Sequence, residues 1–250
     1  MSGPAFAVEL RFSPALQFFL PKRNRGAPLT RILHEKTSIK DAFEACGVPH
    51  PEVNFITCGG VGVGLDYQLQ CDAVVELFGV EDSPRDGLDA CRVNRFVADG
   101  HLGKLTRDLR LLGFDVLYST NATDGELVEI AAAEERALLT RDRRLLMHKV
   151  IRHGYCPRSH DPDEQIVEVI RRFHLEEVIA PFTRCIACGD LLARVAKADV
   201  FEQLEPLTKI YYEEFRRCSR CGKIYWSGSH FGKLEARIAE IRARLHGASP

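Results

Sequence analysis

The sequence predicts an α/β protein in three parts, and three observations support this prediction. Residues 5–79 contain short strand-like segments around one helix, residues 95–173 alternate between strand-like and helix-like segments, and residues 183–229 hold two Cys-x-x-Cys pairs. Strands that alternate with helices are typical of a parallel sheet covered by helices. The chain has 250 residues, of which 45% are hydrophobic and 28% are charged. This composition is typical of a folded globular protein.

The first part is expected to be a small α+β layer pair. Apolar patterning predicts strands at 5–12, 16–20, 53–57, 68–69 and 73–78. A helix over 39–46 is expected to begin at Thr37 or Ser38 and to stop at Gly47. The glycine-rich tract 59–64 has no Lys-Ser/Thr after it and leads into a strand, so we interpret it as a turn and not as a phosphate loop.

The second part has the pattern of a parallel sheet with helices on both faces. The segment 81–93 is rich in acidic residues, Pro and Gly, which predicts a linker. After it, strands are expected at 95–98, 115–118, 137–140 and 155–156, and helices at 102–112, 124–135, 142–148 and 162–173. A charged terminal helix over 231–245 is expected to carry Leu234, Ile238 and Ile241 on one side.

The nine cysteines fall into two groups. Five are scattered without a short-range partner, and the other four form two Cys-x-x-Cys pairs that are 29 residues apart and each followed by Gly: Cys185, Cys188, Cys218 and Cys221. Four thiolates are the ligands of a closed, structural zinc site, and the Gly permits the positive φ of a tight knuckle. Disulfides or redox dithiols are the alternative, which a reducing cytoplasm disfavours. The sequence therefore predicts structural zinc.

Three aspartates follow predicted strands. Asp99 and Asp142 come directly after the first and third strands of the parallel sheet, and Asp124 opens the helix after the second strand. Ligand sites of open parallel sheets lie beyond the carboxyl ends of the strands, so these carboxylates are candidates for a shared Mg²⁺ or Mn²⁺ site. Such a site hydrolyses phosphodiesters with water as the nucleophile. The alternative is that each Asp only caps a helix, as the capping box Thr123–Glu126 predicts near Asp124.

Basic side chains accompany the same segments. Lys104, Arg107 and Arg110 lie on the helix after Asp99, and Arg141 precedes Asp142. These are candidate donors to the phosphates of a nucleic acid, and the alternative is that they cover solvated helix faces. Near the second cysteine pair, Tyr225 and Trp226 either stack on bases or form the core of the small cysteine module.

The net charge of the chain narrows the classes of partner. Lys and Arg number 34 against 35 Asp and Glu, which excludes a chain that binds nucleic acid over its whole surface. Residues 183–250 hold 12 basic and 8 acidic side chains, a mild bias that permits phosphate contacts. No apolar run reaches the roughly 18 residues that span a bilayer, and polar residues interrupt residues 1–20. We expect a cytoplasmic protein with no membrane partner.

Further motifs lie at residues 96–105, 109–115, 138–142 and 221–230, in addition to the cysteine pairs. In combination they resemble the Mut-seven C-terminal RNase family. The resemblance implies a PIN-like fold with a fused zinc ribbon, and a metal-dependent ribonuclease, PIN-like and endonucleolytic, with Asp99, Asp124 and Asp142 as its acidic site. Residues 5–79 resemble the ubiquitin-like β-grasp module, which is similar to sulfur-carrier proteins. No terminal Gly-Gly follows Phe78-Gly79, so carrier chemistry is disfavoured.

These observations lead to one functional hypothesis and one rival. The chain is expected to divide into a β-grasp domain at 1–80, a linker at 81–93, a PIN-like nuclease domain at 94–182, a zinc ribbon at 183–232, and a helix with a tail at 233–250. The hypothesis is Mg²⁺- or Mn²⁺-dependent hydrolysis of RNA by attack of water. The rival is a non-catalytic RNA- or ribosome-binding adaptor that uses the ribbon and the β-grasp domain. A protein partner of the β-grasp domain is compatible with both.

Overall fold

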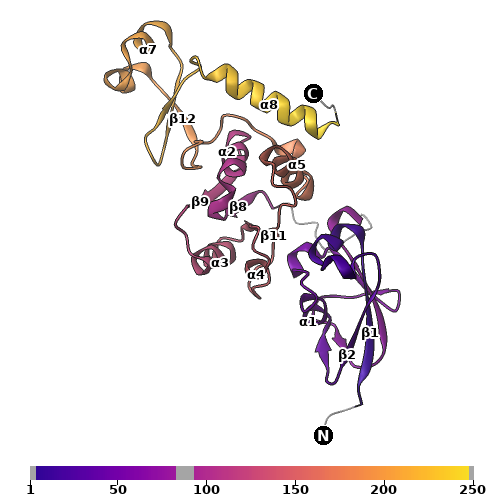
Figure 1. Ribbon diagram of the computed structural model, residues 1–250. Coiled ribbons are helices and arrows are strands. Elements are labelled where there is room, and N and C mark those ends of the chain that lie inside the picture. Colours follow the sequence, from indigo (N-terminus) through magenta and orange to yellow (C-terminus); the bar gives the residue numbers. More distant parts are fainter. Residues whose placement is uncertain (1–3, 83–92, 248–250) are drawn as a thin grey trace. The chain divides into compact units, whose positions relative to one another are not determined.

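A computed structural model describes residues 4–82 and 93–247 (Figure 1). The chain divides into two compact units. The first unit comprises Met1–Arg92 and Thr140–Arg158, and the second comprises Val93–Leu139 and Ser159–Pro250. The predicted linker 81–93 lies mostly outside the described residues, as do the last three residues of the predicted tail.

The first unit is built on a five-stranded sheet with the order β2-β1-β7-β4-β5. Strands β1 (Phe6–Phe12) and β7 (Ala73–Phe78) are parallel neighbours in its centre. The antiparallel strands β2 (Leu29–Leu33), β4 (Phe55–Cys58) and β5 (Val61–Gly62) complete it. A separate pair joins β3 (Thr37–Ser38) to β6 (Gln68–Leu69). Helix α1 (Ile39–Glu44) buries Ile39, Ala42 and Phe43 and covers the sheet, which gives the expected α+β layer pair.

The helix start in this unit is as predicted, and one strand is not. The Ser38 side chain accepts a hydrogen bond from the Asp41 amide at 3.0 Å, which caps α1. The strand predicted at 16–20 is wrong, because Pro14–Phe19 forms a 3₁₀ helix. Pro14 starts this helix, and Leu16 and Phe19 are buried at helical spacing, so the apolar residues do not alternate as in a strand. Strand β2 was not predicted.

Residues 140–158 belong to the first unit as a separate segment of chain. They form the one-turn helix α4 (Arg143–Leu146) and the short strand β11 (Gly154–Tyr155). Three further 3₁₀ turns of this unit lie at Lys22–Asn24, His50–Glu52 and Val80–Asp82.

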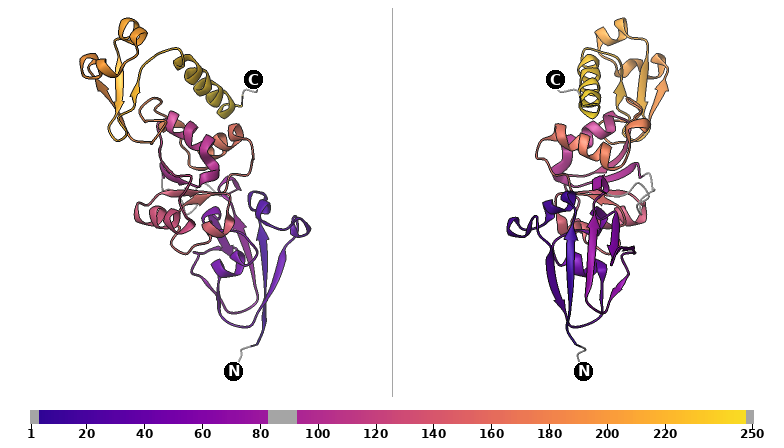
Figure 2. Two further views of the ribbon diagram at one scale, coloured as in Figure 1. Left: turned by 60° about the vertical axis from the view of Figure 1, so that its left-hand side comes forward. Right: turned by 90° about the vertical axis from the view of Figure 1, so that its right-hand side faces the viewer.

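The second unit contains the predicted parallel strands. Strand β8 (Arg95–Ala98) pairs in parallel with β9 (Asp115–Tyr118) on one side and with β10 (Ala137–Leu139) on the other. Figures 1 and 2 show these strands between helix α3 (Asp124–Ala133) on one face and the pair α2 (Gly103–Leu111) and α5 (Pro162–Arg172) on the other. Residues 96–98 are fully buried, as expected for a strand covered on both faces.

The cysteine module follows as a three-stranded antiparallel sheet. Its strands are β12 (Leu192–Val195), β13 (Phe215–Cys218) and β14 (Ile224–Tyr225), and the helices α6 (Lys197–Val200) and α7 (Pro206–Tyr211) connect the first two strands. Val200, Leu204 and Phe215 form the small core. The four clustered cysteines make this module consistent with a zinc ribbon.

The terminal helix α8 (Phe231–Leu245) packs against α5 and buries Ile238, Ile241 and Leu245. Arg237 on α8 lies 2.6 Å from Asp163 of α5 and also pairs with Asp108 of α2. The apolar face and these ion pairs fix α8 to the parallel-sheet layer. None of the helices in the described ranges is long and apolar enough to cross a bilayer. The fold class predicted from sequence, α/β with a ribbon and an N-terminal α+β module, is confirmed.

Candidate functional site

The four predicted cysteines come together in the second unit. Their sulfur atoms all lie within 4.8 Å of one another, with 3.6 Å from Cys185 to Cys221 and 3.3 Å from Cys188 to Cys218. A zinc ion with four Zn–S bonds of about 2.3 Å holds its sulfurs about 3.8 Å apart, so this spacing fits a tetrahedral site. The eight cysteines in the described ranges are unbridged, and the convergence of four sulfurs on one point favours a shared metal over two disulfides.

The two knuckles have the backbone conformation that the Gly residues permit. Gly189 and Gly222, each one residue after a cysteine pair, have φ angles of 87° and 72°. At Gly189 an added Cβ would lie 2.8 Å from the Val116 carbonyl oxygen and 2.9 Å from the Arg110 side chain. Gly is therefore needed here for its backbone conformation and for the close approach of strand β9.

The environment of Cys185 stabilises its thiolate. Burial alone raises the pKa of this thiol, but hydrogen bonds from the Tyr225 hydroxyl, 3.1 Å away, and from the Cys188 amide outweigh burial and lower the pKa to about 6. For Cys188, burial and the neighbouring thiols raise the pKa to about 12. Ionisation of Cys188 is therefore opposed by burial and by the thiolate beside it. A bound dication stabilises all four thiolates.

Each of the three predicted acidic residues lies at the start of a helix. Asp99 caps the 3₁₀ helix Gly100–Leu102, and Asp142 caps α4 by accepting a hydrogen bond from the Arg144 amide at 2.8 Å. Asp124 is the first residue of α3, which begins with the predicted capping box of Thr123 and Glu126. The capping role that the sequence left open is therefore present at Asp99 and Asp142, whereas Thr123 is the cap of α3.

The strand register brings the chain to one edge of the sheet before each aspartate. Ala98 of β8 is in register with Tyr118 of β9 and with Leu139 of β10. Asp99 and Asp124 belong to the second unit, and Asp142 belongs to the first. Within residues 4–82 and 93–247, the four cysteines are the only group of three or more His, Cys, Asp or Glu whose ligand atoms could share a metal. An acidic metal site at the three aspartates stays a prediction.

The predicted basic residues differ in their exposure. Lys104 and Arg107 are exposed on α2, and Arg141 is half-buried. Arg110 is only 4% exposed, and its guanidinium donates to the Val116 carbonyl oxygen at 2.8 Å and to the Ala187 carbonyl oxygen at 2.8 Å. Arg110 therefore ties the first cysteine knuckle to β9, and its donors face backbone carbonyls.

A groove in the first unit lies beside Asp142. It has a volume of about 580 Å³ and joins the end of α1 to residues 141–147. Glu44 and Gly47 line it from the sheet domain, and Arg141, Asp142 and Arg144 line it from the inserted segment. The exposed carboxylate of Asp142 thus lies next to a wall of the N-terminal sheet domain.

Buried charged contacts hold the segment 140–158 to that domain, and sequence reasoning did not identify them. Glu52, 3% exposed, accepts a hydrogen bond from the Cys156 amide at 2.7 Å and pairs with Arg158 at 2.7 Å. His50 lies between Glu44 and the Ile151 carbonyl oxygen, with both ring nitrogens at 2.6 Å from an acceptor. No local sequence pattern marks these side chains as buried.

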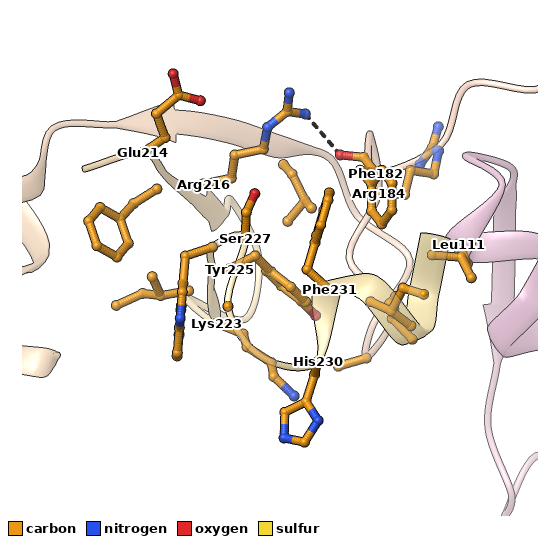
Figure 3. Close-up of a pocket in the computed structure, with 18 of the residues that line it drawn as sticks. Leu111, Phe182, Arg184, Glu214, Arg216, Lys223, Tyr225, Ser227, His230 and Phe231 are labelled. Carbon is orange, nitrogen blue, oxygen red and sulfur yellow. Dashed lines mark hydrogen bonds between the residues drawn. The ribbon is translucent and has the colours of Figure 1, made fainter. Parts of the chain in front are cut away.

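The second unit contains a larger cleft, of about 860 Å³, between the ribbon, the start of α8 and α2 (Figure 3). Arg107 and Leu111 line it from α2, and Phe182 and Phe231 stack against each other beside it with ring centroids 4.7 Å apart. Trp226 is 38% exposed at this cleft and also contacts Phe215 of the ribbon core, at 6.4 Å between centroids. Tyr225 is half-buried and directs its hydroxyl to Cys185.

Comparison with known protein families gives one match for each of two parts of the chain. Residues 94–238 match the family model described as the Mut7-C RNAse domain, and residues 5–82 match the model described as Mut7-C ubiquitin. No curated protein and no solved structure matches the chain. The resemblance inferred from the sequence motifs is confirmed, and the first match covers more than half of the chain. The chain belongs to the Mut7-C RNAse family and carries a Mut7-C ubiquitin domain before the RNAse domain.

Proposed function

We propose that the protein is a metal-dependent ribonuclease that hydrolyses RNA by attack of water at an acidic site formed by Asp99, Asp124 and Asp142. Membership of an RNase domain family supports a nuclease role in general. The observation that carries the proposal is the register of β8 with its two parallel neighbours, at Ala98, Tyr118 and Leu139. All three strands end at the same edge of the sheet. Open parallel sheets bind ligands at this edge, beyond the carboxyl ends of the strands.

The distances along the chain support the same site. Asp99 follows its strand directly, and Asp142 follows Leu139 by three residues, a span of at most about 10 Å for an extended chain. Asp124 follows Tyr118 by six residues and begins α3. Mg²⁺ or Mn²⁺, when held by such carboxylates, lowers the pKa of a coordinated water and stabilises the leaving oxygen of the phosphodiester. Lys104 and Arg141, both near these aspartates in sequence, would contact phosphates.

The four-cysteine cluster has a separate, structural role in this proposal. Zinc bound by Cys185, Cys188, Cys218 and Cys221 leaves no open coordination position, so it supplies no water for catalysis. Its contribution is to fix the two knuckles and the strands between them. The cluster fits zinc in ligand type, ligand number and sulfur spacing.

The capping geometry gives a sharp test of the aspartates. Asn is as good an N-cap as Asp, so Asp99→Asn and Asp142→Asn keep the hydrogen bond to the helix and remove only the charge. We expect both variants to lose at least about a hundredfold in the rate of cleavage of labelled RNA with Mn²⁺. Asp66→Asn, which changes an exposed carboxylate of the first unit, should cleave at the wild-type rate. Unchanged cleavage in the Asp99 and Asp142 variants would remove the proposed site.

A second candidate is a non-catalytic RNA-binding adaptor. It is supported by the four cysteines being the only group found in the described residues that could share a metal. In this case RNA binds in the absence of added Mg²⁺ and Mn²⁺, and no divalent metal gives turnover. Cleavage by the wild type that is lost in Asp99→Asn would exclude the adaptor.

A further inference from the structure

The cleft beside the ribbon concentrates positive charge in a chain that is close to neutral overall. Its lining contains Arg107, Arg184, Arg194, Arg216, Lys223 and Lys233. Against these six cations stand Glu213 and Glu214, and Glu213 is paired with Lys197. This excess is local, because the whole chain carries a net charge of −1. A cleft of this sign attracts anionic ligands.

The cations of the cleft divide into those that hold the walls and those that are available to a ligand. Arg216 donates to the Phe182 carbonyl oxygen at 2.9 Å (Figure 3). Arg184 donates to the Gly189 carbonyl oxygen, also at 2.9 Å. The side chains of Arg107, Arg194 and Lys233 have no hydrogen bond or ion pair with any residue in the described ranges. These three cations come from α2, β12 and α8, so they approach the cleft from different walls.

Aromatic rings lie among these cations. Phe182 and Phe231 form a stacked pair, with 29° between the ring planes, and the close-up shows both rings within the cleft (Figure 3). Trp226 presents 38% of its surface at the same cleft. Rings that alternate with cations match a ligand whose flat apolar groups alternate with phosphates. Single-stranded nucleic acid has this chemistry, whereas a duplex stacks its bases on one another and offers no free base face along its length.

We infer that this cleft binds single-stranded RNA, with an unpaired base on the ring of Trp226 and phosphates on Arg107, Arg194 and Lys233. The choice of RNA rests on the proposed ribonuclease function. A volume of about 860 Å³ is at the upper end of the roughly 300–1,000 Å³ that ligand sites occupy, so the cleft accommodates part of a strand and not a duplex.

The position of Arg107 on α2 connects the cleft to the proposed acidic edge. Arg107 lies one helical turn from Gly103, where α2 begins, and the 3₁₀ turn that Asp99 caps precedes Gly103 directly. With a rise of about 1.5–2 Å per residue, the two helical segments between Asp99 and Arg107 advance at most roughly 14 Å. A strand held in the cleft therefore has the acidic edge within a few nucleotides of its bound segment.

Binding can be measured separately from cleavage with the full-length, zinc-loaded protein and no added Mg²⁺ or Mn²⁺. The probe is a labelled 12-nucleotide RNA of mixed sequence, followed by fluorescence anisotropy. Trp226 is the only tryptophan, so unlabelled RNA should also quench the intrinsic fluorescence of the wild type by stacking on this ring. We expect Trp226→Ala to weaken binding about tenfold or more and Trp226→Phe to retain most of the affinity.

Charge reversal tests the phosphate contacts. The double variant Arg194→Glu/Lys233→Glu should weaken binding more than tenfold and reduce the slope of log affinity against log salt by about 1.4, at ~0.7 for each lost contact. Arg242→Glu, an exposed cation on α8 outside the cleft, is the matched control and should bind as the wild type does. Zinc content and melting temperature of each variant confirm that the ribbon is intact.

The outcomes separate this inference from the proposed function. Wild-type affinity in both the Trp226→Ala and the charge-reversed variants would overturn the inference that the cleft binds RNA. This holds even if Asp99→Asn abolishes cleavage. Equal affinity for duplex RNA, or displacement of the RNA by an acidic peptide at similar concentration, would overturn the assignment to single-stranded RNA. RNA binding that depends on Trp226, without cleavage under any divalent metal, would support the cleft as the RNA-binding site. The same result would reject the proposed ribonuclease function.

Discussion

The buried carboxylate of Glu52 bonds to Arg158, 106 residues later in the sequence, at 2.7 Å and accepts the amide of Cys156 with its other oxygen. This contact fixes the segment that follows Asp142 to the N-terminal sheet domain. The ubiquitin-like part of the chain therefore has an internal structural role: it holds a segment of the RNAse domain.

Glu52→Gln should lower the free energy of unfolding of the first unit by roughly 2–4 kcal/mol, because it removes the negative charge from a largely buried ion pair with Arg158. Glu9→Gln removes an exposed ion pair with Arg11 from the same unit and should cost less than about 1 kcal/mol. Urea unfolding followed by circular dichroism measures both. Equal effects of the two substitutions would contradict a structural role for Glu52.

Zinc removal should affect one module first. We expect about one zinc per chain, and Cys185→Ser should lose it, because a hydroxyl is a poor replacement for a thiolate ligand. Chelation should increase hydrogen exchange in residues 183–229 while β8 and β9 stay protected, since the parallel strands have their own buried core. Cys71→Ser changes an exposed cysteine of the first unit and serves as the control. Loss of protection in β8 at the same rate would show that the ribbon does not unfold separately.

Local patterns predicted the parts of the fold whose signals are local. The buried run of β8, the capping of α1 and α3, and the cysteine pairs with their glycines are each specified within a few residues. The error at Pro14–Phe19 arose because a short apolar run fits either a strand or a helical turn. Strand β2 is an edge strand with alternating partial exposure, and Thr30 and Arg31 interrupt its apolar residues, so it has no continuous apolar run of the kind that marks a central strand.

The roles of charged side chains depended on contacts that no short window contains. Arg107 and Arg110 lie three residues apart on α2 and look alike in sequence, yet one lines the cleft and the other is buried against β9 and the cysteine knuckle. Glu52 and Arg158 likewise meet through the tertiary fold alone. The sequence therefore identified the candidate phosphate donors. Only the structure shows which of them line the cleft and which are buried against backbone carbonyls.

The thiol of Cys156 should resist alkylation. Burial is the main cause that raises its pKa, to about 11, with a further contribution from Glu52. Because only the thiolate reacts, about one molecule in a thousand is reactive at pH 8, and the fraction rises tenfold with each pH unit up to about pH 11. Mass spectrometry after iodoacetamide treatment at pH 8 should find Cys71 modified well before Cys156. Rapid modification of Cys156 in the folded protein would contradict its burial.

Two glycines of the second unit should respond oppositely to the same substitution. Gly113 ends α2 with a φ of +96°, and an added Cβ would lie 2.2 Å from the Ala180 carbonyl oxygen. Gly113→Ala combines backbone strain with a clash against main chain and should destabilise the unit by several kcal/mol, at least about 2.

Gly125 lies in the first turn of α3, where a Cβ meets nothing within 4 Å. Gly125→Ala should therefore stabilise the unit by about 0.4–1 kcal/mol, because Ala loses less backbone entropy on folding. Thermal unfolding of the two variants beside the wild type tests the sign of each effect. A Gly113→Ala protein as stable as the wild type would mean that the turn between α2 and β9 can move away from residue 180, which would contradict the close approach of these two segments.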